Sequence, residues 1–326
     1  MARIISISSD WPEACREAIE VLATARPIAI ATETVYGLAA DATSAQAITS
    51  IYETKGRPRF NPLICHMSDL AMAERHAVFD PLSRKLAERF WPGPLTLVLP
   101  IREESDIHPL ATAGLDTVGI RVPLGAAGKL IAAFGRPLAA PSANTSGGVS
   151  PTSAAHVQAD LGDRIALILD GGPSPVGVES TIIKVDTEGR VHLLRPGGIS
   201  AEEIEAVLST ELVRPVKAGA IIEAPGMLAS HYAPDARVRL NAEAVGADEA
   251  LLAFGPDRIE GAETAAAVLN LSPAGDLAEA AANLFAYLKK ADASGASAIA
   301  VMPIPDHGLG EAINDRLSRA AAPRDA

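Results

Sequence analysis

The sequence predicts an α/β protein with a twisted, open, mixed sheet, followed by a smaller α/β unit. Short apolar runs typical of strands alternate with segments whose apolar residues recur at helical spacing. Before residue 212, several strand-like runs follow one another without a helix between them, so a mixed sheet fits better than a purely parallel one. A chain of 326 residues is long enough for about two domains.

The first unit opens with a helix over residues 12–25, which Asp10 caps and in which Ala18, Ile19 and Leu22 recur at helical spacing. Further helices are expected over residues 44–52, 69–77, 81–90, 129–134 and 201–208. Strands are expected over residues 27–32, 62–67, 95–100, 117–123, 137–144 (running into a loop), 165–169, 180–185 and 191–197.

The composition changes after Leu212. Residues 213–237 are rich in proline and glycine and lack a clean period, which predicts a linker or lid between a catalytic domain over 1–212 and a C-terminal domain over 238–326. In the C-terminal domain, strands are expected over 238–242, 250–255 and 298–305, and helices over 277–290 and 310–321. This alternation predicts a small Rossmann-like layer. The chain has no GxGxxG and no P-loop motif.

The bulk composition disfavours several classes of function. With 28 basic and 40 acidic residues, the net charge is −12, which argues against tight binding of a nucleic-acid duplex through its phosphates. Cys15 and Cys65 have no companions that suggest a disulfide framework or a zinc site. We find no signal-peptide pattern and no apolar run of transmembrane length, so a cytoplasmic protein is expected.

The segment KGRPRFNPL gathers cations in a short loop stiffened by prolines. Lys55, Arg57 and Arg59 suit phosphate or carboxylate oxygens, and Asn61 suits a polar ligand group. The alternative is a solvated basic turn. A second segment, APSANTSGGVSP, offers backbone N–H groups and short hydroxyls to an anion, unless it is an ordinary Ser/Gly loop.

Two further strand segments carry polar groups. Arg121 lies within the apolar run VGIRVP and needs a partner, either a substrate carboxylate or a structural carboxylate in a buried ion pair. In GVESTIIKV, Glu179, Ser180 and Thr181 stand at the start of a strand, and Arg195 follows in LLRPG. Ligand groups often approach such positions.

Histidines and the linker give weaker signals. His66 follows a strand, where it either orients a ligand or is a satisfied edge histidine. His231 and Tyr232 lie in the linker, which either closes over a cleft or docks for packing. We find no Ser–His–Asp grouping, carboxylate pair or zinc set, and no metal ligand is assigned to a protein side chain. Cations, hydroxyls and amides suit charge stabilisation at a polyphosphate.

Taken together, the segments TETVYGL, KGRPRFNPL, WPGPLTLVL, VGIRVP, APSANTSG, GVESTI, LRPG and PGMLASHYAP resemble the threonylcarbamoyl-AMP synthase family in its long form. The resemblance implies a YrdC-like sheet around a concave, positively lined cavity. It also implies that L-threonine, bicarbonate and ATP give threonylcarbamoyl-adenylate and diphosphate, with Mg²⁺ accompanying ATP. The product would feed N6-threonylcarbamoyladenosine formation in tRNAs reading ANN codons, through a downstream tRNA threonylcarbamoyl transferase.

The resemblance also implies roles for individual residues. The family's catalytic signature falls on Lys55, Arg57, Ser142 and Asn144. The residues expected to serve ATP are Lys55, Arg57, Asn61, Thr117, Ser142, Ala143, Asn144, Ser150, Arg195 and Tyr232. The residues expected to hold L-threonine are Thr34, His66, Arg121 and Thr181.

Two other readings stay open. The concave surface could hold RNA, although the acidic balance argues against direct tRNA binding; a salt-steep, specific gel shift would favour this reading. A related carbamoyl transferase that uses carbamoyl phosphate would carry zinc-finger and acylphosphatase segments, which two cysteines do not support.

Overall fold

The computed structural model describes residues 1–58, 60–214 and 231–323. Arg59 and residues 215–230 of the expected linker lie outside the described residues. The helices are α1 Trp11–Ala23, α2 Ala45–Lys55, α3 Leu70–His76, α4 Pro81–Phe90, α5 Ala126–Phe134, α6 Ala154–Leu161, α7 Ala201–Leu208, α8 Leu277–Asp292 and α9 Leu309–Ala321. The strands are β1 Arg3–Ser6, β2 Ile28–Ile30, β3 Gly37–Asp41, β4 Ile64–His66, β5 Leu95–Pro100, β6 Thr117–Arg121, β7 Leu138–Ala139, β8 Leu167–Asp170, β9 Thr181–Val185, β10 Val191–Arg195, β11 Arg237–Arg239, β12 Ala250–Ala253, β13 Ala267–Asn270 and β14 Ala298–Val301.

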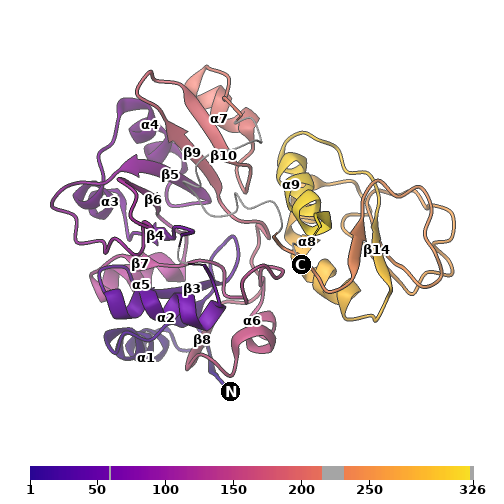
Figure 1. The fold of residues 1–326 in the computed structure, drawn as a ribbon, viewed down its shortest axis with the longest axis horizontal. Coiled ribbons are helices and arrows are strands. Elements are labelled where there is room, and N and C mark those ends of the chain that lie inside the picture. The colour runs from indigo at the N-terminus through magenta and orange to yellow at the C-terminus, as the bar shows by residue number, and fades with distance from the viewer. Residues whose placement is uncertain (59, 215–230, 324–326) are drawn as a thin grey trace.

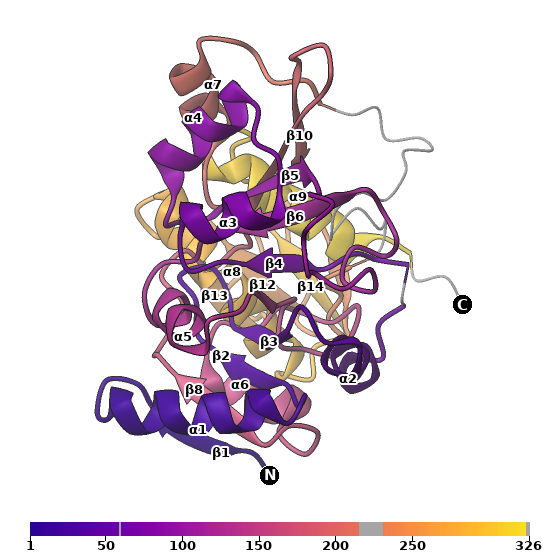
Figure 2. The same cartoon turned by 90° about the vertical axis from the view of Figure 1, so that its left-hand side faces the viewer.

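The first unit is built on a ten-stranded sheet with the order β1-β8-β2-β3-β7-β4-β6-β5-β9-β10. Figure 2 shows this order from β1 near the bottom to β10 near the top. The sheet contains both parallel pairs, such as β4 with β6, and antiparallel pairs, such as β5 with β6. The predicted mixed α/β fold is therefore confirmed.

Local sequence signals explain many element boundaries. The Asp10 side chain accepts a hydrogen bond from Glu13 N and caps α1, as predicted. Helix α2 begins after the Ser44 cap and ends at Gly56, whose φ of 62° suits glycine. This left-handed cap turns the chain directly after Lys55 and starts the cation loop.

Three elements of the first unit, and β13 of the second unit, are absent from the sequence prediction. Strand β3 is short and rich in glycine and alanine, which have little preference for strands, yet it is fully buried and pairs with β2 and β7. Strand β1 pairs with β8 at one edge of the sheet, and α6 begins at the Ser153 cap. Tertiary pairing forms the two strands, and the α6 cap is a local signal that the sequence analysis missed.

The second unit has a four-stranded sheet with the order β11-β14-β12-β13, and its pairs are parallel. Leu252 and Ile299 pack in one core with residues of α8 and α9, whereas Leu251 and Ala300 belong to a separate cluster. Because side chains alternate along a strand, the two helices cover one face of this sheet.

The two units meet along α8 and α9, which lie on the side of the second unit that faces the first (Figure 1). Val35, Val149 and Val178 of the first unit share an apolar core with Leu284 and other residues of the second. The Lys289–Asp160 ion pair also joins the units, and the Arg214–Glu311 ion pair joins the linker to α9. None of the helices in the described part of the chain is both long and apolar enough to cross a membrane. The exact domain boundaries stay a prediction.

Gly197 allows the chain after β10 to lie against the segment that carries Glu179. A Cβ at Gly197 would meet Glu179 O and Thr181 N at 2.4 Å, both backbone atoms. We expect Gly197→Ala to lower the free energy of unfolding by about 1–3 kcal/mol, because the two segments must separate. Denaturant unfolding measures this change. The control is Gly119→Ala, whose Cβ would have its nearest contact at 3.6 Å. Equal stability of the two variants would contradict the prediction.

Candidate active site

A narrow cavity lies where the ends of β4 and β6 meet the start of β9 and the linker residues His231 and Tyr232. Its open volume is about 50 Å³. It is lined by Thr34, Val35, Arg57, Ile64, His66, Arg121, Ala140, Pro141, Ser142, Glu179, Ser180, Arg195, His231 and Tyr232. Seven of these were predicted as site residues: Thr34, Arg57, His66, Arg121, Ser142, Arg195 and Tyr232.

One wall of the cavity is built by β4, β6 and the segment after β2. The parallel register of β4 and β6 pairs His66 with Arg121 at the carboxyl ends of both strands. Arg121 Nη1 donates to Thr34 Oγ1 at 2.9 Å, and Nη2 lies 2.7 Å from Glu33 Oε1. Arg121 thus lines the cavity and also forms the buried ion pair that the sequence left open as an alternative.

The opposite side carries the cation loop (residues 55–63) and the segment around Ser142, Ala143 and Asn144, called the SAN segment (residues 140–151). Lys55 Nζ donates to Ser142 O at 2.5 Å and to Asn144 O at 2.6 Å. Arg57 Nη2 donates to Pro62 O at 3.1 Å, and Arg57 Nε is buried without a hydrogen-bond partner in the described residues. Neither cation has an ion pair within the described part of the chain. This side is suited to an anion.

Glu179 stands beside these cations. Its Oε1 accepts from Ser150 Oγ at 2.6 Å and its Oε2 accepts from Arg316 Nε at 2.7 Å. Arg195 Nη2 donates to Ser180 O at 2.9 Å. The Tyr232 ring lies against His231, with centroids 4.1 Å apart, at the mouth of the cavity.

Burial shifts the pKa values of the lining groups. Burial and the charge of Arg57 lower the pKa of Lys55, and burial lowers the pKa of Arg57 to about 10. Burial and the charge of Arg121 lower the pKa of His66 to about 3. For Glu179, burial acts to raise the pKa, but the charges of Arg316 and Arg195 lower it to about 2. At neutral pH the site therefore combines a neutral His66 with an ionised Glu179.

The other predicted site residues lie behind the cavity wall or away from it. Lys55 Nζ donates to the backbone oxygens of Ser142 and Asn144, and Ser150 hydrogen-bonds to the lining residue Glu179. Thr181 Oγ1 donates to Ile199 O at 2.6 Å. Asn61 lies within the cation loop, and Ala143 N donates to Tyr36 O at 2.8 Å. Thr117 stands at the opposite end of β6 from Arg121. The roles of all these residues stay predictions.

The sequence analysis did not assign several lining residues. Glu179, Ser180 and His231 had been noted as polar groups next to strands or in the linker, which is a usable signal. Val35, Ile64, Ala140 and Pro141 are apolar and carry no signal that separates a cavity wall from a core. Arg316 lies in a helix more than a hundred residues away, and nothing in the local sequence connects it to this site.

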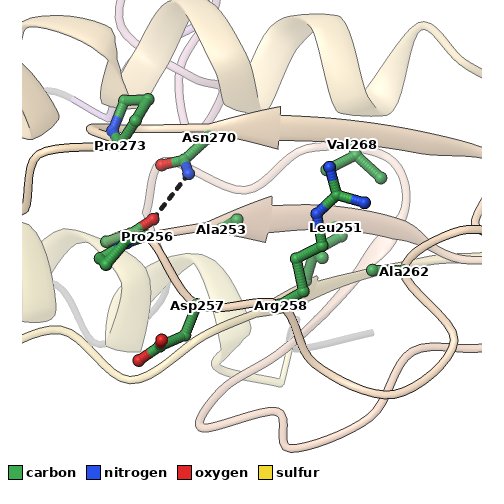
Figure 3. A pocket seen from close by; sticks show the side chains of 10 residues that line it. Leu251, Ala253, Pro256, Asp257, Arg258, Ala262, Val268, Asn270 and Pro273 are labelled. Atoms are coloured by element: carbon green, nitrogen blue, oxygen red, sulfur yellow. Dashed lines mark hydrogen bonds between the residues drawn. The ribbon is translucent and has the colours of Figure 1, made fainter.

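A larger cavity of about 450 Å³ lies in the second unit, at the carboxyl ends of β12 and β13 (Figure 3). Leu251, Ala253 and Val268 line it, and Asn270 Nδ2 donates to Gly255 O at 2.9 Å beside it. Its charged lining residues, Asp257 and Arg258, are exposed. The smaller cavity is the candidate active site, because buried charges gather there.

The donor set of the smaller cavity does not fit a metal ion held by side chains. Within the described part of the chain, Glu179 is the one carboxylate that lines the cavity, and Ser150 and Arg316 occupy both carboxylate oxygens. Among the described residues, no group of three or more His, Cys, Asp or Glu could hold a metal ion. Any Mg²⁺ would enter with the phosphates of a nucleotide.

Comparison with protein families gives two matches. A model described as "Telomere recombination" (Sua5_yciO_yrdC) matches residues 20–197, and a model described as "Threonylcarbamoyl-AMP synthase, C-terminal domain" matches residues 199–322. Among solved structures, the chain is similar to E. coli YciO, with a TM-score of 0.54 at 20% identity, covering 60% of this chain and 96% of that one. The fold and the first family model thus define a YrdC-like α/β protein, and buried arginines line its smaller cavity.

Full-length relatives define the family more closely. The chain is 40% identical to the threonylcarbamoyl-AMP synthase of Bacillus subtilis, covering 91% of this chain and 90% of that protein. It is 41% identical to the Pyrococcus abyssi synthase, covering 91% of both. The crystal structure of P. abyssi Sua5 complexed with L-threonine has a TM-score of 0.87 at 38% identity, covering 98% of this chain and 97% of that one. The chain belongs to the threonylcarbamoyl-AMP synthase family, and the predicted enzyme class is confirmed.

The buried, neutral His66 makes stability depend on pH. Below pH 6.5 the unfolded chain protonates this histidine, whereas the folded chain does not until about pH 3, so acid favours unfolding. On going from pH 7 to pH 5, we expect the free energy of unfolding of wild type to fall by about 2 kcal/mol more than that of His66→Asn. Denaturant unfolding across this range measures the difference. If the free energies of unfolding of the two proteins change with pH in parallel, His66 is protonated in the folded state, which would contradict the prediction.

Proposed function

We propose that this cavity joins L-threonine, bicarbonate and ATP into threonylcarbamoyl-adenylate and diphosphate, the first step towards N6-threonylcarbamoyladenosine in tRNA. The observation that carries the proposal is the convergence of Arg57, Arg121 and Arg195, all buried, on one cavity. The substrates are anionic, so their close approach needs cations that offset their repulsion. The crystal structure of the P. abyssi relative was obtained with L-threonine, which supports the amino-acid substrate.

The wall formed by Thr34, His66 and Arg121 would hold L-threonine. Arg121 already contacts Glu33, and its planar guanidinium can add the threonine carboxylate as a second anionic partner. The neutral His66 can accept a hydrogen bond from the amine or the hydroxyl. Because His66 is buried and uncharged, it would not form an ion pair with the threonine amine, which stays available to react.

The reaction would proceed in two bond-forming steps. The threonine amine nitrogen bonds to the carbon of bicarbonate or CO₂; from bicarbonate, this releases water and leaves a carbamate. A carbamate oxygen then attacks the α-phosphorus of ATP, and the bond to the bridging oxygen of the diphosphate breaks. Lys55, Arg57 and Arg195 would stabilise the charge that develops on the phosphate oxygens. The SAN segment would bind the nucleotide through backbone N–H groups and hydroxyls.

The linker would act as a lid. Small-molecule sites usually have volumes of about 300–1,000 Å³, whereas the open volume here is about 50 Å³. His231 and Tyr232 line this narrow space, so their displacement would be needed to admit ATP. Their return would exclude water from a hydrolysable mixed anhydride. The cytoplasmic location and the downstream transferase stay predictions.

The direct test is diphosphate release from ATP by the purified protein, with L-threonine and bicarbonate omitted one at a time. Release that requires both substrates supports the proposal. Release without threonine would point to plain hydrolysis or another acceptor. Absence of release from folded protein supplied with Mg²⁺ would favour the RNA-binding alternative.

We expect Arg57→Ala to lower diphosphate release by at least about 100-fold, because a preorganised cation next to the phosphates is lost. The fold should remain, since Arg57 donates to carbonyl oxygens rather than to a buried carboxylate. Steady-state kinetics and thermal unfolding measure both effects. Lys85→Ala, which removes an exposed cation, serves as control. Activity like that of wild type would remove Arg57 from the mechanism.

We expect Arg121→Lys to raise the KM for L-threonine about tenfold and to change the KM for ATP by less than about twofold. Lysine keeps a positive charge opposite Glu33 but loses the planar fork that would bind a carboxylate. Steady-state kinetics with each substrate varied in turn measure the two KM values separately. An effect confined to ATP would assign Arg121 to the other substrate.

A further inference from the structure

The side chain of Arg316, in helix α9 of the C-terminal unit, hydrogen-bonds to Glu179, which lines the active site. The arginine side chain has no exposed surface. Nε donates to Glu179 Oε2 at 2.7 Å, and Nη1 donates to Asp315 Oδ2 at 2.6 Å. Nη2 is buried and has no hydrogen-bond partner among the described residues. A fully buried arginine is costly unless a specific geometry uses it.

Glu179 connects Arg316 to the nucleotide side of the site, because it binds residues of both units. The same carboxylate that binds Arg316 accepts from Ser150 Oγ at 2.6 Å, and Ser150 closes the SAN segment. The loop that carries Glu179 is also pressed against α8. A Cβ at Gly177 would lie 2.3 Å from Ala281 O. The position of Glu179 therefore depends on the C-terminal unit twice, through α8 and through Arg316.

Arg316 also contacts the lid residue. Its guanidinium carbon lies 5.2 Å from the centroid of the Tyr232 ring, and Phe285 of α8 stacks on the same ring at 5.5 Å. Tyr232 has a φ of 62°, which is unusual for an aromatic residue and requires surroundings that hold it. His231 N donates to Arg319 O, and Ala233 N donates to Gly147 O. The lid residue is thus clamped between α8, α9 and the SAN segment.

We propose that Arg316 is a positioning residue for the nucleotide side of the active site, which holds Glu179 beside Ser150 and Tyr232 over the cavity. The proposal rests on the function proposed above and gives the C-terminal unit a role in it. The threonine wall has no such link among the described residues, because the side-chain hydrogen bonds and ion pairs of Thr34, His66 and Arg121 are with residues of the first unit. Loss of Arg316 should therefore affect the two substrates differently.

The test compares Arg316→Met with a control on the same helix. Glu311→Gln removes one charge of the partly exposed Arg214–Glu311 ion pair, which joins the linker to α9 and includes no residue that lines the cavity. For Arg316→Met we expect kcat/KM for ATP to fall about tenfold or more, with the KM for L-threonine within about twofold. Glu311→Gln should behave like wild type. Arg316→Lys should recover part of the loss, because it restores the charge without the fork.

A buried carboxylate without its partner destabilises a fold, so a second pair of variants separates positioning from stability. Glu179→Gln and the double variant Glu179→Gln/Arg316→Met leave no unpaired Glu179 charge. If the two residues act as a unit, the double variant should lose about as much kcat/KM for ATP as the worse single variant. If the losses of kcat/KM for ATP in the two single variants multiply in the double variant, the proposal is overturned. It is also overturned if kcat/KM falls equally for ATP and L-threonine, in proportion to the fraction of unfolded protein.

Hydrogen exchange gives a readout that does not depend on turnover. In Arg316→Met, peptides that cover residues 147–150 and 231–233 should exchange faster than in wild type and Glu311→Gln, while peptides of β4 and β6 stay unchanged. Unchanged exchange together with unchanged ATP kinetics overturns the proposal even if wild type is active. If wild type shows no threonine-dependent release, the proposed function fails, and the exchange result alone decides whether Arg316 holds this segment.

Discussion

Buried positive charge is the constraint on which the rest of this structure depends. Lys55, Arg57, Arg121 and Arg195 are exposed by 3%, 8%, 4% and 3%. A buried cation is strongly unfavourable unless backbone carbonyls, carboxylates or a ligand replace the water it has lost. Here carbonyls of the SAN and cation loops hold Lys55 and Arg57, and Glu33 holds Arg121. Arg57, whose Nε has no hydrogen-bond partner among the described residues, lines the cavity where the substrates would bind.

The fold supplies the geometry that this constraint needs. The parallel register of β4 and β6 sets His66 beside Arg121, and the left-handed cap at Gly56 turns the chain so that Arg57 follows Lys55 into the same site. The close approach at Gly197 brings the end of β10 against the Glu179 segment. The C-terminal unit then adds Arg316 and Phe285 around Tyr232, so the site is completed by residues from both units.

The sequence analysis identified those site residues that stand in a recognisable local motif. Proline, glycine and cations within nine residues identified the loop at Lys55 and Arg57, and an arginine in an apolar strand identified Arg121. It missed β3, because five Gly- and Ala-rich residues form a strand only when β2 and β7 flank them. It also missed the pair of Arg316 and Glu179, which are 137 residues apart. Such a contact exists only after the two units have docked, and no local pattern reports it.

The most direct test of the central claim is a mass spectrum of the nucleotide product formed from ATP, L-threonine and bicarbonate labelled with carbon-13. The account predicts an adenylate that contains threonine and the labelled carbon, formed in equal amount to diphosphate. An adenylate without the label, or ADP and phosphate in place of diphosphate, would contradict the claim that the buried cations bring these three substrates together for attack at the α-phosphorus.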